Sequence, residues 1–349
     1  MNTQQAAMIS RTSSGRKVMS ACVLVALIFV GIVISMTVGS NRLSLTTVLN
    51  ALLEPDGSFE SLVVTQQRWP RTLLLIVVGT ALGTAGALMQ ALTRNPLADP
   101  GILGVNAGAS LAVVASVALF GLSSISSYVW FSFIGAAFAS VAVYLIGSAG
   151  TGNAGAGSPT NPSRLTLAGV AITMAISAVV QVMILTNQAA FNEFRFWAAG
   201  SAQGRGFNVL YAVLGFILFG VFIAIAVTPA LNAMALGDAA STALGVRVGV
   251  VRGVVMLAVT LLAGAATAAI GPIMFVGLAV PFLARLIAGA DWRWIVALSA
   301  LAAPTFLLFA DVLARIIVAP NEVEVGLVSA LIGGPIFVWI IRHSRVTAL

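Results

Sequence analysis

The sequence predicts an all-α integral membrane protein with about ten transmembrane helices. Of its 349 residues, 60% are hydrophobic and only 8% are charged, and the mean hydropathy is +1.07. These values lie far outside the range of soluble globular proteins. Apolar runs of roughly 20 residues, the length that a helix needs to cross a hydrocarbon core of about 30 Å, recur along the chain.

Ten apolar stretches follow one another in the sequence. They cover residues 18–38, 72–93, 102–121, 127–148, 165–187, 208–228, 250–270, 271–289, 295–315 and 326–341. The seventh and eighth run together, with only Gly271 and Pro272 as a break, so the pattern also allows nine or eleven spans. We assign residues 1–17 to an N-terminal tail and residues 18–349 to a single transmembrane domain.

The distribution of positive charge indicates the orientation of these spans. With a cytoplasmic N-terminus, eleven of the 17 Lys and Arg residues lie on the cytoplasmic side and six on the outer side. Because positive charge is enriched in cytoplasmic loops, both termini are expected in the cytoplasm. The stretch 18–38 is interpreted as a span, since it exceeds the about 7 to 15 apolar residues of a signal peptide and lacks an A-x-A cleavage site.

The residue counts argue against several kinds of chemistry. Cys22 and His343 are the only Cys and His, which excludes an intrachain disulfide, a cysteine-based metal site and a His cluster. Lys17 is the only lysine and does not stand in a G-x-x-x-x-G-K-[ST] motif, so this chain should not hydrolyse ATP through a P-loop. We expect no catalytic residue, cofactor or metal in this chain, and no nucleic-acid partner.

The second stretch, 72–93, is rich in small residues, including Gly79, Gly83 and Gly86. Small residues let helices approach closely where lipid offers no hydrophobic drive for association, so this helix is expected to be central. Gln90 is costly to place in lipid and is expected to face protein or an aqueous path.

The segment NPLADPG, residues 95–101, ends this stretch. Pro96 and Pro100 remove backbone donors and push the residues before them towards extended or turn conformations. Irregular backbone near membrane depth is tolerated where protein or a water-filled cavity covers it, so the segment could act as a gate. An ordinary reverse turn between spans is the alternative, and spacing alone favours it.

The segment LNAMALGDAASTALGVRVG, residues 231–249, connects spans six and seven on the cytoplasmic side. Asp238 can cap a short helix that begins at Ala239, and Gly245 can end that helix in a left-handed conformation. Such a helix would fit a partner's groove, and a plain connector is the alternative. Its small apolar face would consist of Ala240, Ala243 and Leu244.

Two other connecting segments are interpreted from their composition. Residues 147–163 are rich in Gly, Ser and Asn, which indicates a flexible cytoplasmic loop. Residues 191–207 mix aromatic and charged residues, which favours an interfacial helix anchored by Trp197 over a ligand site.

Long motifs in the chain resemble a known family. They are RWPRT at 68–72, GTALGTAGALMQALTRNPLADPGILGVNAGA at 79–109, GPIMFVGLAVPFLARLIAG at 271–289, ADVLARII at 310–317 and VGLVSALIGGPIFVWIIR at 325–342. Together they closely resemble the FecCD-type permease subunits of ABC transporters that import iron-siderophores, haem and cobalamin. Phe282 stands where the family often has His, and Glu324 where it often has Pro.

The resemblance implies a type II ABC importer permease fold and a set of partners. The permease domain would pair with a second permease subunit, in a homodimer or a heterodimer. It would bind two ATPase subunits, which use ATP-Mg, and an extracytoplasmic substrate-binding protein. The complex would lie in the lipid bilayer of a bacterial inner or plasma membrane.

The resemblance also implies roles for particular residues. Arg68 and Arg71 of R-x-P-R, and Arg315 of ADVLAR, would pair with glutamates on the binding protein. For the first two the alternative is snorkelling to the interface, and Arg315 could instead pair with Asp311 at i−4. The cytoplasmic gate would contain Asn95 and Leu97, with Gln90 and Ser177 along the translocation path. The ATPase-coupling helix would involve Leu236, Gly237, Asp238, Ala240, Leu244 and Gly245.

These expectations favour the permease subunit of an importer for ferric siderophores, haem or cobalamin over three alternatives. A zinc or manganese ABC importer permease would differ in substrate and not in mechanism. An ion-coupled secondary transporter normally places ionisable residues mid-membrane, whereas these spans hold few, with Asp311 near an outer end. A membrane enzyme is disfavoured by the dearth of His, Cys and paired carboxylates.

Overall fold

The structure, a computed structural model, describes residues 14–39, 41–122, 124–148 and 162–343. Within these residues the chain is helical and contains no strand. Most of the expected N-terminal tail and of the expected loop at 147–163 lies outside the described residues.

In the described residues, ten apolar helices of different lengths correspond to the ten predicted spans. They are α2 (Ser14–Thr37), α5 (Trp69–Thr93), α6 (Val105–Phe120), α7 (Ile125–Ser148), α8 (Pro162–Thr186), α10 (Phe207–Met234), α12 (Val248–Ile270), α13 (Val276–Ala288), α14 (Trp292–Ile316) and α15 (Val325–His343). In the described part of the chain, seven helices are long and apolar enough to cross a membrane, and α6, α13 and α15 are shorter apolar helices. The all-α membrane fold predicted from the sequence is therefore confirmed.

Short helices connect or extend these spans. They are α3 (Leu45–Leu53), α4 (Phe59–Leu62), the π-helix η1 (Val63–Arg68), the 3-10 helix η2 (Pro100–Leu103), α9 (Gln188–Ala198) and α11 (Asp238–Ala243). Helical backbone runs without a break from Phe59 through η1 to the end of α5. The second span therefore begins well before residue 72, where its charge-free apolar run starts.

The break between spans seven and eight is real but longer than predicted. α12 ends at Ile270, and Gly271 follows with a φ of 79°. Helical structure resumes only at Val276, because Phe275 also has a positive φ, of 67°. Residues 271–275 are therefore an irregular connection, and the helix predicted at 271–289 is shortened to α13.

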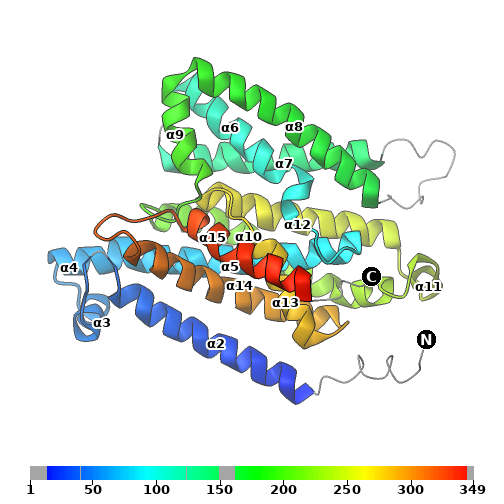
Figure 1. The fold of residues 1–349 in the computed structure, drawn as a ribbon, viewed down its shortest axis with the longest axis horizontal. Helices are drawn as coiled ribbons and strands as arrows, with labels where there is room; N and C mark the ends of the chain where they lie inside the picture. The colour runs from blue at the N-terminus through cyan, green and yellow to red at the C-terminus, as the bar shows by residue number, and fades with distance from the viewer. Residues whose placement is uncertain (1–13, 40, 123, 149–161, 344–349) are drawn as a thin grey trace.

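The long helices run roughly along one axis of the molecule (Figure 1). α3 and α4 lie at one end, called the α3 end, and α11 lies at the other, called the α11 end. α2 begins, and α15 ends, towards the α11 end. α5 packs against α14, α12, α13 and α10, while α6, α7, α8 and α9 form a group on one side that contacts α12 through α7 and α6.

The glycines of α5 bring backbones into direct contact at the centre. A Cβ added to Gly86 would lie 1.9 Å from the carbonyl oxygen of Gly277 in α13. One added to Gly83 would lie 2.3 Å from the carbonyl oxygen of Ser299 in α14. The sequence prediction that this helix is central is confirmed, and the contact distances explain why glycine is required at these positions.

Trp197 does not anchor α9 at an interface, so this part of the sequence interpretation is wrong. Its side chain is only 1% exposed and belongs to the hydrophobic core. A Cβ on Gly271 would lie 2.2 Å from the carbonyl oxygen of Trp197, so the connection after α12 packs directly against the end of α9. A helical segment does form here, but the tertiary fold buries its tryptophan.

We predict that Gly86→Ala destabilises the bundle. The new methyl group would overlap the Gly277 carbonyl, and overpacking of this kind typically lowers the free energy of unfolding by about 1–3 kcal/mol. The apparent melting temperature of the purified protein in detergent would measure this. Gly215→Ala on α10 is a matched control, since nothing lies within 4 Å of a Cβ there. Equal melting temperatures for the two variants would contradict the prediction.

Candidate functional site

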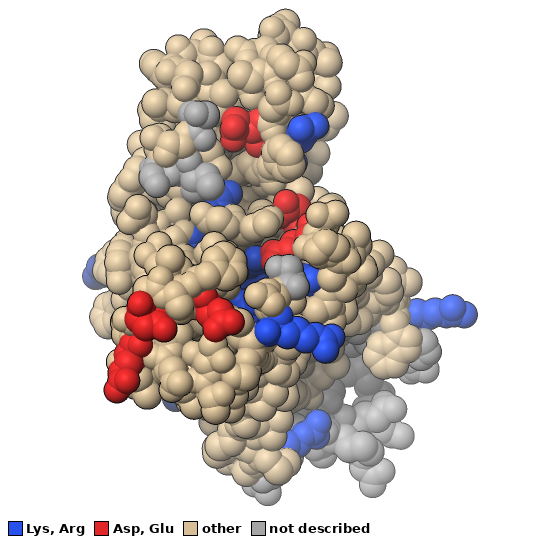
Figure 2. All heavy atoms as spheres, turned by 90° about the vertical axis from the view of Figure 1, so that its left-hand side faces the viewer, with Lys and Arg blue, Asp and Glu red and all other residues tan. Residues whose placement is uncertain are grey.

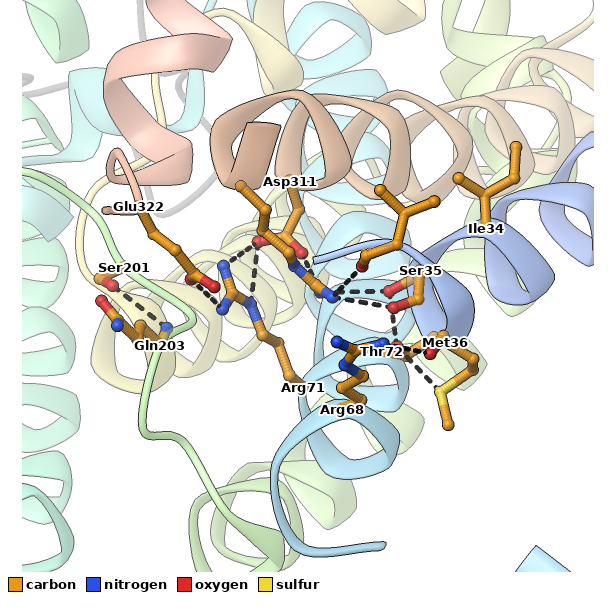
Figure 3. A network of polar contacts seen from close by, with 12 residues as sticks. Ile34, Ser35, Met36, Arg68, Arg71, Thr72, Ser201, Gln203, Asp311 and Glu322 are labelled. Atoms are coloured by element: carbon orange, nitrogen blue, oxygen red, sulfur yellow. Dashed lines mark hydrogen bonds and ion pairs between the residues drawn. The ribbon is translucent and has the colours of Figure 1, made fainter. Parts of the chain in front are cut away.

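A buried charged cluster lies near the α3 end, with Asp311 of α14 at its centre (Figure 3). Arg71 donates to Asp311 Oδ1 from Nε at 3.0 Å and from Nη2 at 2.7 Å. The remaining terminal nitrogen of Arg71 contacts Glu322 Oε2 at 2.6 Å. Arg315 pairs with the second carboxylate oxygen of Asp311. Asp311, which is fully buried, is thus neutralised by two guanidinium groups.

Hydrogen bonds to α2 and to the segment that follows it complete the cluster. Arg315 Nη1 donates to the carbonyl oxygen of Ser35 at 2.8 Å, and Arg315 Nη2 donates to the Ser35 hydroxyl at 3.1 Å. Arg68 donates to the carbonyl oxygens of Met36, at 2.6 Å, and Asn41. Buried charge is tolerated when it is paired and hydrogen-bonded, and here that requirement ties α2, η1, α5 and α14 together.

The cluster places the three predicted docking arginines differently from the sequence expectation. Arg68, Arg71 and Arg315 are all buried, with guanidinium groups bonded inside the chain. In this conformation the three arginines are neither available to glutamates of a binding protein nor snorkelling to the interface, whereas the alternative pairing of Arg315 with Asp311 is present. Docking stays a prediction that would require the cluster to open. Sequence reasoning missed Glu322 and the contact of Arg71 with Asp311, and only the i−4 spacing of Asp311 and Arg315 signalled a pair.

The surface of the α3 end carries other charges. In Figure 2, acidic and basic side chains are both visible on a mostly uncharged face. The exposed acidic residues Glu54, Asp56 and Glu60 belong to α4 and to the connection that follows α3, and Arg42 is an exposed basic residue just before α3. These residues are more accessible than the buried cluster.

The segment NPLADPG forms a turn at the end of α5. Arg94 ends the helix with a φ of 50°, in the left-handed region. The Asn95 side chain then accepts a hydrogen bond from the backbone N–H of Leu97 at 2.9 Å. Asn95 is exposed and Leu97 is half-buried. The reverse turn expected from spacing is therefore present, and the gate remains a prediction.

Asp99 closes this turn and begins η2. Its carboxylate accepts a hydrogen bond from the backbone N–H of Gly101 at 2.7 Å. Burial raises the pKa of Asp99 above its ordinary value, and the bond from Gly101 offsets only part of that effect.

α11 follows the turn of Gly237, which has a φ of 102°. The helix begins at Asp238 itself, and no side chain caps it, so the predicted capping role of Asp238 is wrong. Its carboxylate instead contacts Arg94 at 2.5 Å and Arg252 of α12 at 2.9 Å. The Asp238 carboxylate therefore pairs with these two arginines and not with the backbone N–H groups at the start of α11. The left-handed conformation predicted for Gly245 is confirmed by its φ of 84°.

Apolar side chains around α11 lack a cover within the described chain. Leu236 is 68% exposed and Leu244 is 64% exposed. Ala243 is also exposed, whereas Ala240 is half-buried. The face predicted from Ala240, Ala243 and Leu244 therefore exists in part, with Leu236 next to it. Its function as a partner contact remains a prediction.

The two predicted path residues have contrasting environments. Gln90 is fully buried, and its Nε2 donates to the carbonyl oxygen of Leu278 at 3.0 Å. The expectation that Gln90 faces protein is thus confirmed. Ser177 is exposed on α8, and its role in a path remains a prediction.

Comparisons with known proteins agree over nearly the whole chain. The model of the FecCD transport family matches residues 27–343. The ferric enterobactin transport system permease protein FepD of Escherichia coli is 43% identical over 321 residues, covering 92% of this chain and 94% of FepD. The Fe(3+)-citrate import system permease protein YfmD of Bacillus subtilis is 38% identical over 335 residues, covering 96% and 97% of the two chains.

A solved structure is similar as well. It is described as a metal-chelate type ABC transporter in an inward-facing conformation, and it superimposes with a TM-score of 0.81 at 25% sequence identity. The match covers 93% of this chain and 99% of the solved one. The helical arrangement is therefore shared along the whole length of that chain.

We predict that Asp311→Asn strongly destabilises the protein. The substitution leaves Arg71 and Arg315 buried without their shared carboxylate, and breaking a buried ion pair typically costs about 3–5 kcal/mol. Glu322→Gln is the control and should cost less, since Arg71 keeps Asp311. Thermal unfolding in detergent measures both variants. A smaller loss for Asp311→Asn than for Glu322→Gln would show that the cluster is not centred on Asp311.

We also predict that Asp99→Asn reduces the pH dependence of stability. A raised pKa in the folded state means that stability present at about pH 4 is lost as the pH rises through that pKa. The amide oxygen of Asn can still accept the bond from Gly101, without a buried charge. Melting temperatures of both proteins between about pH 4 and pH 7 should diverge, with the variant higher at the upper end. Parallel curves would refute this.

Proposed function

Because the chain belongs to the FecCD transport family, we propose that it is the membrane-spanning permease subunit of an ATP-driven importer of ferric siderophores. The match over residues 27–343 carries this proposal. Both relatives described above transport iron chelates according to their names. Haem and cobalamin are alternative substrates, and a zinc or manganese importer is the alternative system. The chain is a transport subunit and not an enzyme.

The proposed complex contains two permease subunits, identical or paralogous, and two ATPase subunits that use ATP-Mg. An extracytoplasmic binding protein delivers the substrate at the α3 end. The α11 end faces the cytoplasm, as do both termini. α2 begins and α15 ends towards α11, so these ends lie on one side, and the excess of Lys and Arg expected on that side supports a cytoplasmic location. The exposed Leu236 and Leu244 support an ATPase contact at α11. Neighbouring apolar side chains that are exposed at the end of the helical bundle are typical of a surface that a partner protein covers.

The proposed transport cycle uses two neighbouring elements at the α11 end, α11 itself and the turn after α5. ATP binding in the partner displaces α11, and the turn containing Asn95 and Leu97 opens or closes the cytoplasmic end of the path. Ligand and ATP shift this equilibrium only through different affinities for its states.

Ion-coupled transport is not favoured by the charges of the described helices. Asp311 lies within a span, but Arg71 and Arg315 neutralise it. A carboxylate that binds a coupling ion would have to exchange these partners first.

Reconstitution in proteoliposomes tests this proposal. Uptake of a labelled ferric siderophore, with haem and cobalamin run in parallel, should require the ATPase, the binding protein and ATP. Uptake driven by a proton gradient alone would point to a secondary transporter.

Substitution of one exposed leucine at each end of the molecule tests the ATPase contact. Leu244→Asp should reduce co-purification of the ATPase at least several-fold, because it places a charge on a face that the ATPase would bury. Leu53→Asp is the matched control at the α3 end, where Leu53 is likewise exposed. An unchanged ATPase yield with Leu244→Asp would exclude α11 as the contact.

A further inference from the structure

The polar contacts at the α11 end connect α11 to the turn after α5 through one ion pair. Resting on the proposed function, we infer that Asp238 and Arg94 are positioning residues that transmit a displacement of α11 to Asn95 and Leu97. Neither residue needs to touch the substrate or the ATPase to act in this way.

Arg94 occupies the junction between α5 and the turn. Its backbone provides the left-handed residue that ends α5, and the next residue is Asn95. Its guanidinium Nη2 donates both to Asp238 Oδ1, at 2.5 Å, and to the carbonyl oxygen of Met234 at the end of α10, at 2.9 Å. A pull on this side chain therefore acts on the residue whose backbone conformation directs the turn.

Asp238 occupies the corresponding junction between α10 and α11. It is the first residue of α11, and its two carboxylate oxygens contact different helices, Oδ1 contacting Arg94 and Oδ2 contacting Arg252 of α12. A displacement of α11 carries this carboxylate with it and so moves it relative to one or both arginines.

The backbone at both ends of α11 permits such a displacement. Gly237 and Gly245 flank the helix with φ values of 102° and 84°, and nothing lies within 4 Å of a Cβ at either position. The exposed Leu236 and Leu244 precede and follow the helix, so a partner that binds both leucines can displace α11. α11 is therefore a short rigid piece held between two glycines and joined to α5 by a side-chain contact.

The two ion pairs of Asp238, with Arg94 and with Arg252, differ in how exposed the arginine is to solvent. The side chain of Arg252 is 8% exposed, whereas the side chains of Arg94 and Asp238 are 36% and 33% exposed. Partly exposed ion pairs are weak enough to rearrange. The Arg94 contact is therefore the one that can break and re-form during a cycle, while Arg252 remains fixed on α12.

The test follows the chemical accessibility of position 97 in the reconstituted complex with its ATPase and binding protein. Cys22→Ser removes the only native cysteine, and Leu97→Cys introduces a thiol in the turn. The labelling rate with a membrane-impermeant maleimide is measured without nucleotide and with ATP-Mg and vanadate. We expect a several-fold difference between the two conditions.

Removing the ion pair should abolish this response. Arg94→Gln keeps a side-chain N–H group for Met234 but loses the charge, and Asp238→Asn removes the same pair from the other side. In both variants the ratio of labelling rates should fall to about one, and in Arg94→Gln, which lies outside α11, the ATPase should still bind and hydrolyse ATP. Arg94→Lys, which keeps the charge, should restore part of the response.

Arg252→Gln is the matched control, because it removes the other contact of Asp238 and leaves Arg94 in place. It should retain most of the response. A full response in Arg94→Gln or Asp238→Asn overturns the inference, and so does an equal loss in Arg252→Gln, which would route the motion through α12. No nucleotide response in the parent Leu97→Cys protein refutes instead the proposed gate, on which this inference depends.

Discussion

Close backbone contact between α5 and its neighbours is the constraint on which the rest of the structure depends. Lipid tails are as apolar as the helix surfaces, so hydrophobicity alone cannot hold helices together within a bilayer. The contacts of Gly83 with the Ser299 carbonyl and of Gly86 with the Gly277 carbonyl supply close packing instead. With α5 held at the centre, both of its ends lie among helices that contribute charged partners.

The two ends of α5 use charge in different ways. Near the α3 end, Arg71 shares a fully buried carboxylate with Arg315, and the surrounding carbonyl groups leave little freedom. Near the α11 end, Arg94 and Asp238 are partly exposed, and the helix that begins at Asp238 lies between Gly237 and Gly245, which both have a positive φ. A buried, doubly paired group favours one arrangement, whereas a hydrated pair can exchange partners at low cost. One end is thereby suited to fixing the bundle and the other to moving.

Local sequence patterns were reliable where a backbone preference decides the outcome. α5 ends just before the NPLADPG segment, Gly245 takes a positive φ, and the Gly271-Pro272 break separates two spans. Predictions about side-chain partners fared worse. Trp197 is in the core, Asp238 pairs with two arginines in place of capping α11, and the predicted docking arginines are buried. Their partners lie up to 280 residues away along the chain, as for Arg315 and Ser35.

The sequence by itself determined the membrane class, the approximate spans and the positions of the breaks. Apolar length, prolines and glycines act locally, so these features can be read without knowing the neighbours. Only the tertiary structure decided that Arg71 joins the local pair of Asp311 and Arg315, and that Asp238 reaches Arg94 across 144 residues of sequence. An ion pair depends on the three-dimensional distance between two groups, and in a helical bundle that distance is set by packing.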